Sequence, residues 1–219
     1  MSKLNMIVIK KIFSVFLLTI LLSIFIRVFV GEPCSVSNNS MESTIMDGDW
    51  LWIDKTTYGA VLPNRWSNIP LVNILTWVPG FQERDMSNNW KYRRMKGFAH
   101  PQINDIVVFK SLEDMDLLLI KRVSEILHAG SLIHIDTINF VLYNDIISQE
   151  VRAEVPNNRI INKSYQLKNS YYFLLGDNPD TSRDSRSFGY VSERNIVGKA
   201  NRVLFSTGKE KNRFFKKLE

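Results

Sequence analysis

Cysteine and histidine are scarce in this chain of 219 residues. Cys34 is the single cysteine, so the chain can form neither an intramolecular disulfide nor a thiolate metal cluster. The three histidines lack the i, i+4 spacing and the cysteine partners of familiar metal sites. The sequence therefore predicts no metal centre and no cofactor.

Several familiar nucleophile motifs are also missing. No G-x-S-x-G elbow announces a Ser-His-Asp triad. The letters STGK at 206–209 match the S-x-x-K pattern of penicillin-binding enzymes, but the companion motifs S-D-N and K-T-G are absent. A four-residue match without companions occurs often by chance, so we set it aside.

Charge is nearly absent from residues 12–30, which read IFSVFLLTILLSIFIRVFV. The one charged residue, Arg27, lies close enough to the end to reach lipid headgroups. A helix of this length spans about 28 Å, near the ~30 Å hydrocarbon thickness of a bilayer. A cleaved signal peptide is the alternative, but no A-x-A-like cleavage site follows. We therefore expect an uncleaved transmembrane anchor.

Basic residues are distributed unevenly around this anchor. Residues 1–11 form a short stretch with three lysines, whereas residues 31–50 contain four acidic residues and no Lys or Arg. The positive-inside rule then places the N-terminus in the cytoplasm and residues 31–219 outside it. Although the net charge is +6 and the C-terminus is basic, nucleic acid is not the usual partner there, and we expect a solvated tail.

The chain beyond the anchor predicts one mostly β domain. Short runs rich in Val, Ile, Leu, Phe and Tyr recur between Asp, Asn and Gly residues, and helical periodicity is weak. These expected strands lie within residues 49–59, 103–110, 116–127, 131–148 and 170–177. Such a pattern favours a β-rich barrel or sandwich.

Residues 60–101 form a long segment without a clear strand pattern. It carries Trp66, Trp77 and Trp90 among aliphatic residues, followed by the basic run KYRRMKG. In a soluble protein these aromatics would form a buried flap and the basic residues a solvated face. On a chain tethered to a bilayer, the same composition is typical of a membrane-facing insertion. The sequence leaves both interpretations open.

A serine cluster and an unusual lysine are the candidates for chemistry. Ser40 lies in SNNSMEST at 37–44, and Lys121 follows four apolar residues in an expected strand. Desolvation lowers the pKa of a lysine, and a neutral amine can take the proton of a serine. A lysine after apolar residues is more often a surface residue of a strand, so this pattern alone leaves both readings open.

The order of these segments resembles that of type I signal peptidases, which are membrane-anchored Ser/Lys endopeptidases with a β-rich domain and an N-terminal transmembrane helix. SMEST at 40–44 is similar to the nucleophile box of that family, and GDWLWIDKTTYG at 48–59 to the next box. NDIVVFK and LLIKRV are similar to the strand pair that ends in the general-base lysine. Residues 174–191 contain the signature G-D-N-x-D-x-S-x-D-S-R-x-x-G, which NIVGKA follows.

This resemblance implies that Ser40 is the nucleophile and Lys121 the general base. It also implies that Ser182 holds the lysine amine by a hydrogen bond. Asn38 stands where the family has Ser or Thr, so its amide would complete the oxyanion hole with the Ser40 N–H. Ser43 replaces a proline of the family box. Three further residues would brace the wall around the lysine: Asp177, Asp184 and Arg186.

The implied activity is removal of N-terminal signal peptides from exported preproteins, at the outer side of a bacterial inner membrane. The expected partners are preprotein signal peptides and the lipid bilayer. A specialised maturase for a secretion or conjugation pilin is one alternative. An inactive membrane-anchored binding protein is another, although such a protein would lack the dyad. A self-cleaving repressor-type peptidase should be cytoplasmic, so the spanning segment disfavours it.

Overall fold

The computed structural model describes most of the chain in two compact units. The first unit comprises Met1–Glu32 and Asp54–Phe98, and the second comprises Pro33–Ile53 and Ala99–Glu219. Each unit is described by itself below. The described residues are 3–78, 80–87, 90–114, 117–134, 143, 146–147, 150, 160–161, 164–208, 210 and 212–218.

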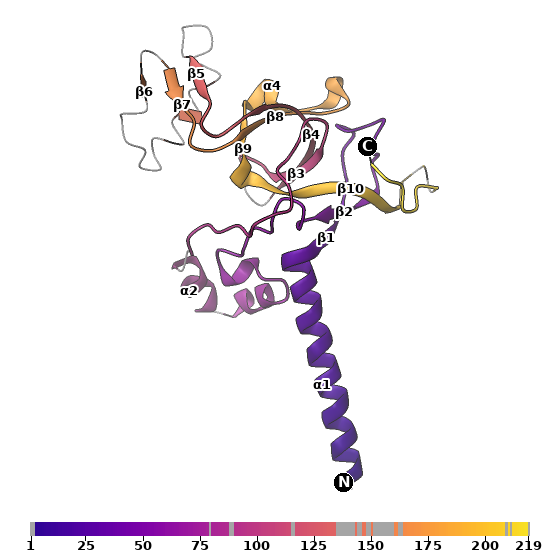
Figure 1. Ribbon diagram of the computed structural model, residues 1–219. Helices are drawn as coiled ribbons and strands as arrows, with labels where there is room; N and C mark the ends of the chain where they lie inside the picture. The colour runs from indigo at the N-terminus through magenta and orange to yellow at the C-terminus, as the bar shows by residue number, and fades with distance from the viewer. Residues whose placement is uncertain are drawn as a thin grey trace. The chain divides into compact units, whose positions relative to one another are not determined.

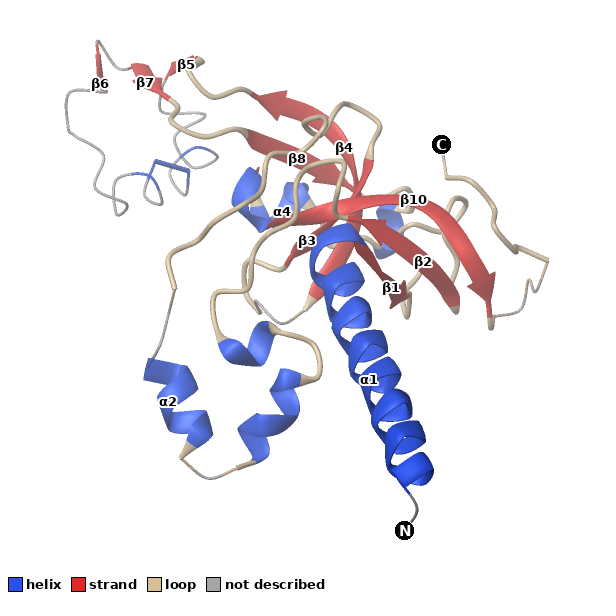
Figure 2. Cartoon of the chain, turned by 60° about the horizontal axis from the view of Figure 1, so that its bottom comes forward, coloured by secondary structure: helices blue, strands red, loops and turns tan. Residues whose placement is uncertain are grey.

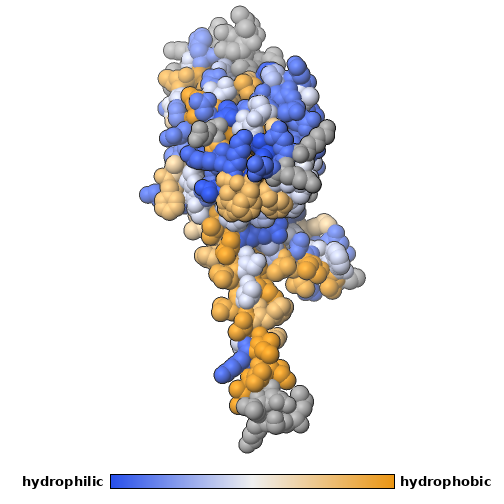
Figure 3. All heavy atoms as spheres, turned by 90° about the vertical axis from the view of Figure 1, so that its right-hand side faces the viewer, coloured by the Kyte–Doolittle hydropathy of each residue, from blue (hydrophilic) through white to orange (hydrophobic). Residues whose placement is uncertain are grey.

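The first unit begins with a long apolar helix, α1 (Lys3–Phe25), which continues as a π-helical turn, η1 (Ile26–Val30). The stretch Met6–Val30 is long and apolar enough to cross a membrane, by length and composition. Apolar side chains cover most of the length of this helix, and few of them are buried (Figure 3). The predicted apolar helix is therefore present.

The rest of the first unit is a segment of short helical turns joined by loops (Figure 2). It contains η2 (Trp66–Asn68), η3 (Val72–Trp77) and α2 (Phe81–Ser87). Such turns are too short to produce a recognisable helical periodicity in the sequence.

Two glycines lie where the ends of this segment cross. A Cβ on Gly59, where φ is +83°, would lie 2.0 Å from the carbonyl oxygen of Met95, and a Cβ on Gly97 would lie 2.3 Å from the carbonyl carbon of Tyr58. Only glycine permits so close a backbone approach. The crossing therefore fixes the base of the segment.

The main sheet has seven strands in the order β1-β2-β10-β3-β4-β8-β9 (Figure 1). Strands β10, β3, β4, β8 and β9 pair successively in antiparallel fashion. The strands are β1 (Gly31–Ser35), β2 (Asp49–Asp54), β3 (Ile106–Lys110), β4 (Leu118–Leu127), β8 (Tyr171–Leu175), β9 (Val191–Ser192) and β10 (Ile196–Ser206). The fold is mostly β, as the sequence predicted.

A second, three-stranded sheet has the order β5-β7-β6. Its strands are β5 (Leu132–His134), β6 (Ile160–Ile161) and β7 (Ser164–Gln166). Of the strand expected over residues 131–148, only β5 is observed, and most of the remainder lies outside the described residues. The other expected runs each contain a strand of the main sheet.

The longest strand of the main sheet, β10, was not predicted. Glycine and polar residues interrupt its apolar ones, as in GKANR at 198–202, which hides the signal. In the structure its first residues alternate between buried and partly exposed positions, and the strand pairs with β3. The neighbouring strand β3 is buried along nearly its whole length. These two strands and β4 form the floor that carries the candidate site.

Candidate active site

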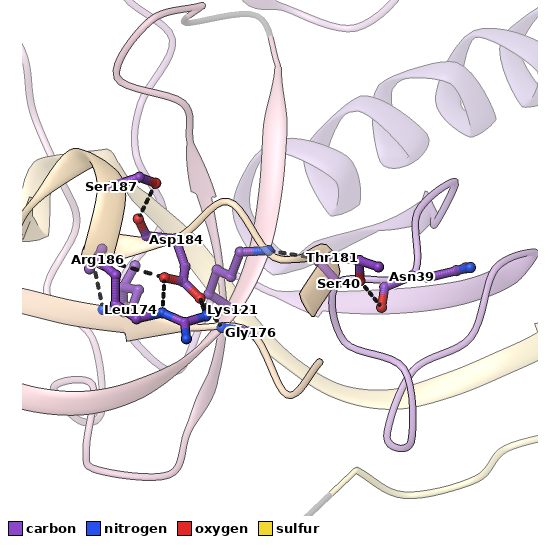
Figure 4. Close-up of polar contacts among 10 residues, drawn as sticks. Asn39, Ser40, Lys121, Leu174, Gly176, Thr181, Asp184, Arg186 and Ser187 are labelled. Atoms are coloured by element: carbon purple, nitrogen blue, oxygen red, sulfur yellow. Dashed lines mark hydrogen bonds and ion pairs between the residues drawn. The ribbon is translucent and has the colours of Figure 1, made fainter. Parts of the chain in front are cut away.

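Ser40 and Lys121 meet in the second unit although 81 positions separate them in sequence. Lys121 lies on β4 opposite Val107 of β3, and Ser40 lies in the turn between β1 and β2. Lys121 Nζ is 2.6 Å from Ser40 Oγ (Figure 4). Lys121 is 2% exposed and Ser40 is 5% exposed. The structure thus brings together the two residues that the sequence predicted as base and nucleophile.

Burial sets the protonation of Lys121. Removal from water lowers the pKa of this amine below its ordinary value of 10.5, because the charged form loses solvation. The nearby carboxylates of Asp184 and Asp177 act in the opposite direction, but burial is the larger effect. The neutral amine is therefore more accessible than in an exposed lysine. A neutral amine in contact with a hydroxyl can act as a general base.

Asp177 joins three parts of the site. It accepts hydrogen bonds from Arg122 Nε and Nη2, each at 2.8 Å, and from Thr44 Oγ1 at 2.6 Å. Burial alone would raise the pKa of Asp177, but these hydrogen bonds outweigh it and hold the pKa below its ordinary value. Arg122 follows Lys121 on β4, and Thr44 closes the nucleophile motif. The sequence reasoning missed both partners, although each lies inside a motif that it had identified.

Asp184 is 1% exposed and caps the short helix α4 (Ser185–Phe188). It accepts hydrogen bonds from Arg186 Nε at 2.9 Å, from Arg186 Nη2 at 2.7 Å and from the backbone N–H of Gly176 at 3.1 Å (Figure 4). Burial tends to raise the pKa of this carboxyl, but the bonds from Arg186 and Gly176 lower it well below its ordinary value. Asp184 therefore stays ionised and ties α4 to the loop after β8 (Tyr171–Leu175).

Gly176 lets this loop approach the nucleophile. A Cβ at Gly176 would lie 2.5 Å from the Ser40 carbonyl oxygen and 2.1 Å from Ser182 Oγ. The next contact along the loop is a hydrogen bond of 3.1 Å from the Asn178 N–H to the same carbonyl of Ser40. The Ser182 hydroxyl is buried and forms no hydrogen bond of normal geometry among the described residues, although it lies close enough to Asp184 to help lower the pKa of that carboxyl. Its predicted bond to the Lys121 amine stays a prediction.

Comparison with known proteins places this chain in a family. The sequence profile of the family described as "Signal peptidase, peptidase S26" matches residues 9–205. The chain belongs to this family. It is accordingly a serine endopeptidase, as the sequence predicted.

Three curated relatives show how far the sequence of this chain has diverged within the signal peptidase family. Signal peptidase I of Rickettsia typhi is 26% identical, over 91% of this chain and 81% of the relative. Signal peptidase I of Rickettsia massiliae is 28% identical, over 90% and 80% respectively. The Rickettsia canadensis protein of the same name is 29% identical, over 88% and 78%. The match thus covers nearly the whole chain at modest identity.

Two departures from the signal peptidase pattern concern the nucleophile turn. Ser43 has φ of +91°, a region that proline cannot adopt because its ring fixes φ near −65°. The turn therefore requires a residue other than proline at this position. Asn38 Oδ1 accepts hydrogen bonds from the Ser40 N–H at 3.2 Å and from the Ser40 hydroxyl at 2.8 Å. The oxygen end of this amide, rather than its NH2, faces the nucleophile.

The C-terminal segment of the chain reaches the back of the same turn. Arg213 is 4% exposed and forms an ion pair of 2.9 Å with the fully buried Asp49. Its Nη2 also donates a hydrogen bond of 2.7 Å to the Thr44 carbonyl oxygen. The expectation of a solvated tail is therefore wrong at Arg213. The basic composition of the tail gave no sign that one arginine is buried.

Proposed function

We propose that this protein is a membrane-bound serine endopeptidase that cleaves N-terminal signal peptides from exported preproteins, with Ser40 as nucleophile and Lys121 as general base. The 2.6 Å contact between Lys121 Nζ and Ser40 Oγ, in a buried setting, carries this proposal. The names of the relatives support the choice of substrate.

The reaction proceeds in two stages at these atoms. In acylation, the Ser40 hydroxyl, which donates to Asn38 Oδ1 at rest, turns its proton toward neutral Lys121, and Lys121 takes this proton while Oγ attacks the scissile carbonyl carbon. The tetrahedral intermediate collapses when the protonated Lys121 gives this proton to the departing amine. In deacylation, the again neutral Lys121 takes a proton from water, whose oxygen attacks the ester carbon. Collapse releases the carboxyl product and returns the proton to Ser40 Oγ.

Asn38 and the Ser40 N–H form the proposed oxyanion hole. In the structure the Ser40 N–H is occupied by Asn38 Oδ1. A half-turn of the Asn38 amide would exchange its oxygen and nitrogen, which would free that N–H and present the NH2 beside it. Both donors could then meet the negative oxygen of the tetrahedral intermediate. Asn38 is thus proposed to change hydrogen-bond role between the resting site and the transition state.

The supporting residues hold Lys121 and Ser40 close together. Arg122 on β4 and Thr44 in the nucleophile turn both donate hydrogen bonds to Asp177. Asp177 therefore couples the two elements that carry Lys121 and Ser40. The buried hydroxyl of Ser182 is proposed to hold the Lys121 amine once the lysine has moved toward substrate. At rest this hydroxyl forms no hydrogen bond of normal geometry among the described residues and only helps to lower the pKa of Asp184, so a contact with the amine would complete its hydrogen bonding.

The substrate is proposed to bind extended, by addition to a strand edge of the sheet, with small residues at the −1 and −3 positions of the cleavage site. The stretch Met6–Val30 would cross the bacterial inner membrane, with the N-terminus in the cytoplasm and the catalytic domain on the outer side. Ser40 follows Val30 by ten residues in sequence. Such a tether keeps the nucleophile close to the bilayer surface, where signal-peptide cleavage sites emerge.

Product sequencing tests the proposed activity. The detergent-solubilised full chain is incubated with a panel of preproteins, and the new N-termini are determined. We expect cleavage after small residues by the wild type and no cleavage by Ser40→Ala. Cleavage restricted to pilin precursors would indicate the specialised maturase instead. An intact panel, with a folded wild-type protein, would contradict the assignment.

The proposed topology has a separate test. Protease is added to spheroplasts that contain the full chain, and the N-terminal sequence of the membrane-bound protein is determined. Digestion of the catalytic domain together with an intact N-terminus is the expected result. A mature N-terminus near Gly31, or a domain protected from the protease, would contradict this topology.

A further inference from the structure

Residues 60–98, which lie within the second part of the first unit, expose large apolar side chains and bury an acidic one. Trp77 is 86% exposed and Ile74 is 55% exposed, both on η3 (Val72–Trp77). Asp85, by contrast, is 4% exposed and accepts hydrogen bonds from the backbone N–H groups of Trp66 and Ser67. Such a distribution is the reverse of that expected for a surface facing water.

Hydrogen bonds and ring packing hold the backbone beneath these exposed side chains in a defined conformation. The Asp85 bonds join α2 to η2, and the rings of Trp66 and Trp90 pack edge to face with centroids 5.1 Å apart. Further backbone bonds tie the two arms of the segment, from the Leu62 N–H to the Arg93 carbonyl and from the Met95 N–H to the Ala60 carbonyl, each 2.9 Å. The apolar surface is therefore a defined feature of the fold.

The charge of the same segment has one predominant sign. Residues 60–98 contain six Lys and Arg residues against two acidic residues, of which Asp85 is buried. Four of the basic residues lie in one short run at the end of the segment: Lys91, Arg93, Arg94 and Lys96. Tryptophan beside exposed Lys and Arg matches the interfacial zone of an anionic bilayer, where rings sit among headgroups and cations meet phosphates.

The base of the segment is bonded to the end of the membrane-spanning stretch. The Lys55 N–H donates to the Val30 carbonyl at 2.9 Å, and Lys55 Nζ donates to the Arg27 carbonyl at 2.9 Å. Glu32 forms ion pairs of 2.9 Å with both Arg27 and Lys55. If Met6–Val30 spans a bilayer, the segment therefore starts at the level where the span leaves the hydrocarbon.

We propose that residues 60–98 form a bilayer-contacting element, in which the η3 side chains, with Trp77 foremost, enter the headgroup region of an anionic membrane and the basic run at 91–96 binds lipid phosphates. This element gives the enzyme a second attachment to the membrane besides the spanning helix. It restrains the first unit against the bilayer surface. The inference depends on the anchor and not on the Ser40–Lys121 chemistry.

Tryptophan quenching by brominated lipids tests this element in the full chain. The protein is reconstituted into vesicles of zwitterionic lipid or of zwitterionic lipid mixed with anionic phosphatidylglycerol, with bromine near the headgroup end of the acyl chains. We expect the lipid-quenchable share of the emission to fall clearly in Trp77→Phe. The matched control Trp50→Phe alters a ring that stacks on Phe205 of the second unit, and it should leave that share unchanged.

The charge arm of the same experiment uses Lys91→Glu combined with Arg93→Glu. We expect anionic lipid to increase the quenching of Trp77 in the wild type and to have little effect in this variant. Equal quenching in Trp77→Phe and Trp50→Phe would overturn the proposal. The proposal would also be overturned if the emission lost in Trp77→Phe were the same with and without brominated lipid but changed with the protein-to-lipid ratio. A second copy of the chain would then cover the surface. None of these readouts requires peptidase activity, so their failure is distinct from failure of the proposed function.

Discussion

The candidate active site and residues 60–98 treat polar and apolar groups in opposite ways. The site buries a lysine, a serine and the carboxylate of Asp184 and partly buries that of Asp177, and both carboxylates receive several hydrogen bonds. The segment instead leaves Trp77 and its neighbours exposed. Burial of charge costs free energy unless the charge is paired, and exposure of apolar surface to water is also unfavourable. Each region therefore indicates a requirement other than stability.

The requirement differs between the two regions. Burial of Lys121 lowers its pKa, which a proton acceptor needs and a structural lysine does not. Exposure of the η3 side chains is unfavourable only in water, and contact with a bilayer would remove this free-energy cost. Under the two proposals, catalysis explains the unfavourable feature of the site, and contact with a bilayer explains that of the segment. Substitutions should therefore affect the two regions very differently.

The largest effect on folding is expected at the buried ion pair behind the nucleophile turn. Arg213→Met leaves Asp49 charged and unpaired in the interior, so the free energy of unfolding should fall by about 3 to 5 kcal/mol. Denaturant unfolding of the solubilised protein measures this loss. Arg183→Met is the matched control, because the Arg183–Glu113 pair is largely exposed and should cost less than about 1 kcal/mol. Similar losses in both variants would show that the buried pair is not special.

The next effect concerns turnover rather than stability. Asn38→Ala should lower kcat by about 10² to 10³, equivalent to ~2.7 to 4 kcal/mol, with little change in KM, since an oxyanion donor acts in the transition state. Asn38→Ser should restore much of the activity, because it restores the residue typical of the family. Steady-state kinetics on one preprotein decides the matter. An alanine variant within threefold of wild type would leave Asn38 only its observed role as hydrogen-bond acceptor in the turn.

The smallest effect on folding is expected in the exposed segment. Trp77→Ser removes a side chain that is 86% exposed, so the free energy of unfolding in detergent should stay within about 0.5 kcal/mol of wild type. The same denaturant titration measures it. A loss of several kcal/mol would mean that Trp77 packs against protein, and the contrast between the two regions would disappear.

The features that could be predicted from the sequence are those marked by a local motif or by a run of apolar residues. Ser40 and Lys121 were found because each lies in a short motif whose order along the chain is distinctive. Strand β3 (Ile106–Lys110) was predicted from a continuous apolar run, whereas β10 (Ile196–Ser206) was missed because polar residues fill its half-exposed positions. Local pattern carries information about motifs and apolar periodicity only.

Contacts between distant residues could not be predicted in the same way. Nothing in the tail distinguishes Arg213 from its basic neighbours, since its partner Asp49 lies 164 positions away. The orientation of the Asn38 amide and the positive φ of Ser43 likewise result from packing of the turn against the rest of the site. Properties of this kind depend on the assembled fold, and a single sequence does not encode them in a readable pattern.

The central claim is that neutral Lys121 activates Ser40, and the pH dependence of kcat/KM tests it most directly. Wild-type kcat/KM on one preprotein should rise with pH as Lys121 loses its proton, and should level off below the ordinary lysine pKa of 10.5, because burial lowers the pKa of this amine. Lys121→Arg should be inactive across the same range, since a guanidinium stays protonated. Substantial cleavage by Lys121→Arg, or a wild-type profile that only begins to rise near 10.5, would contradict the account.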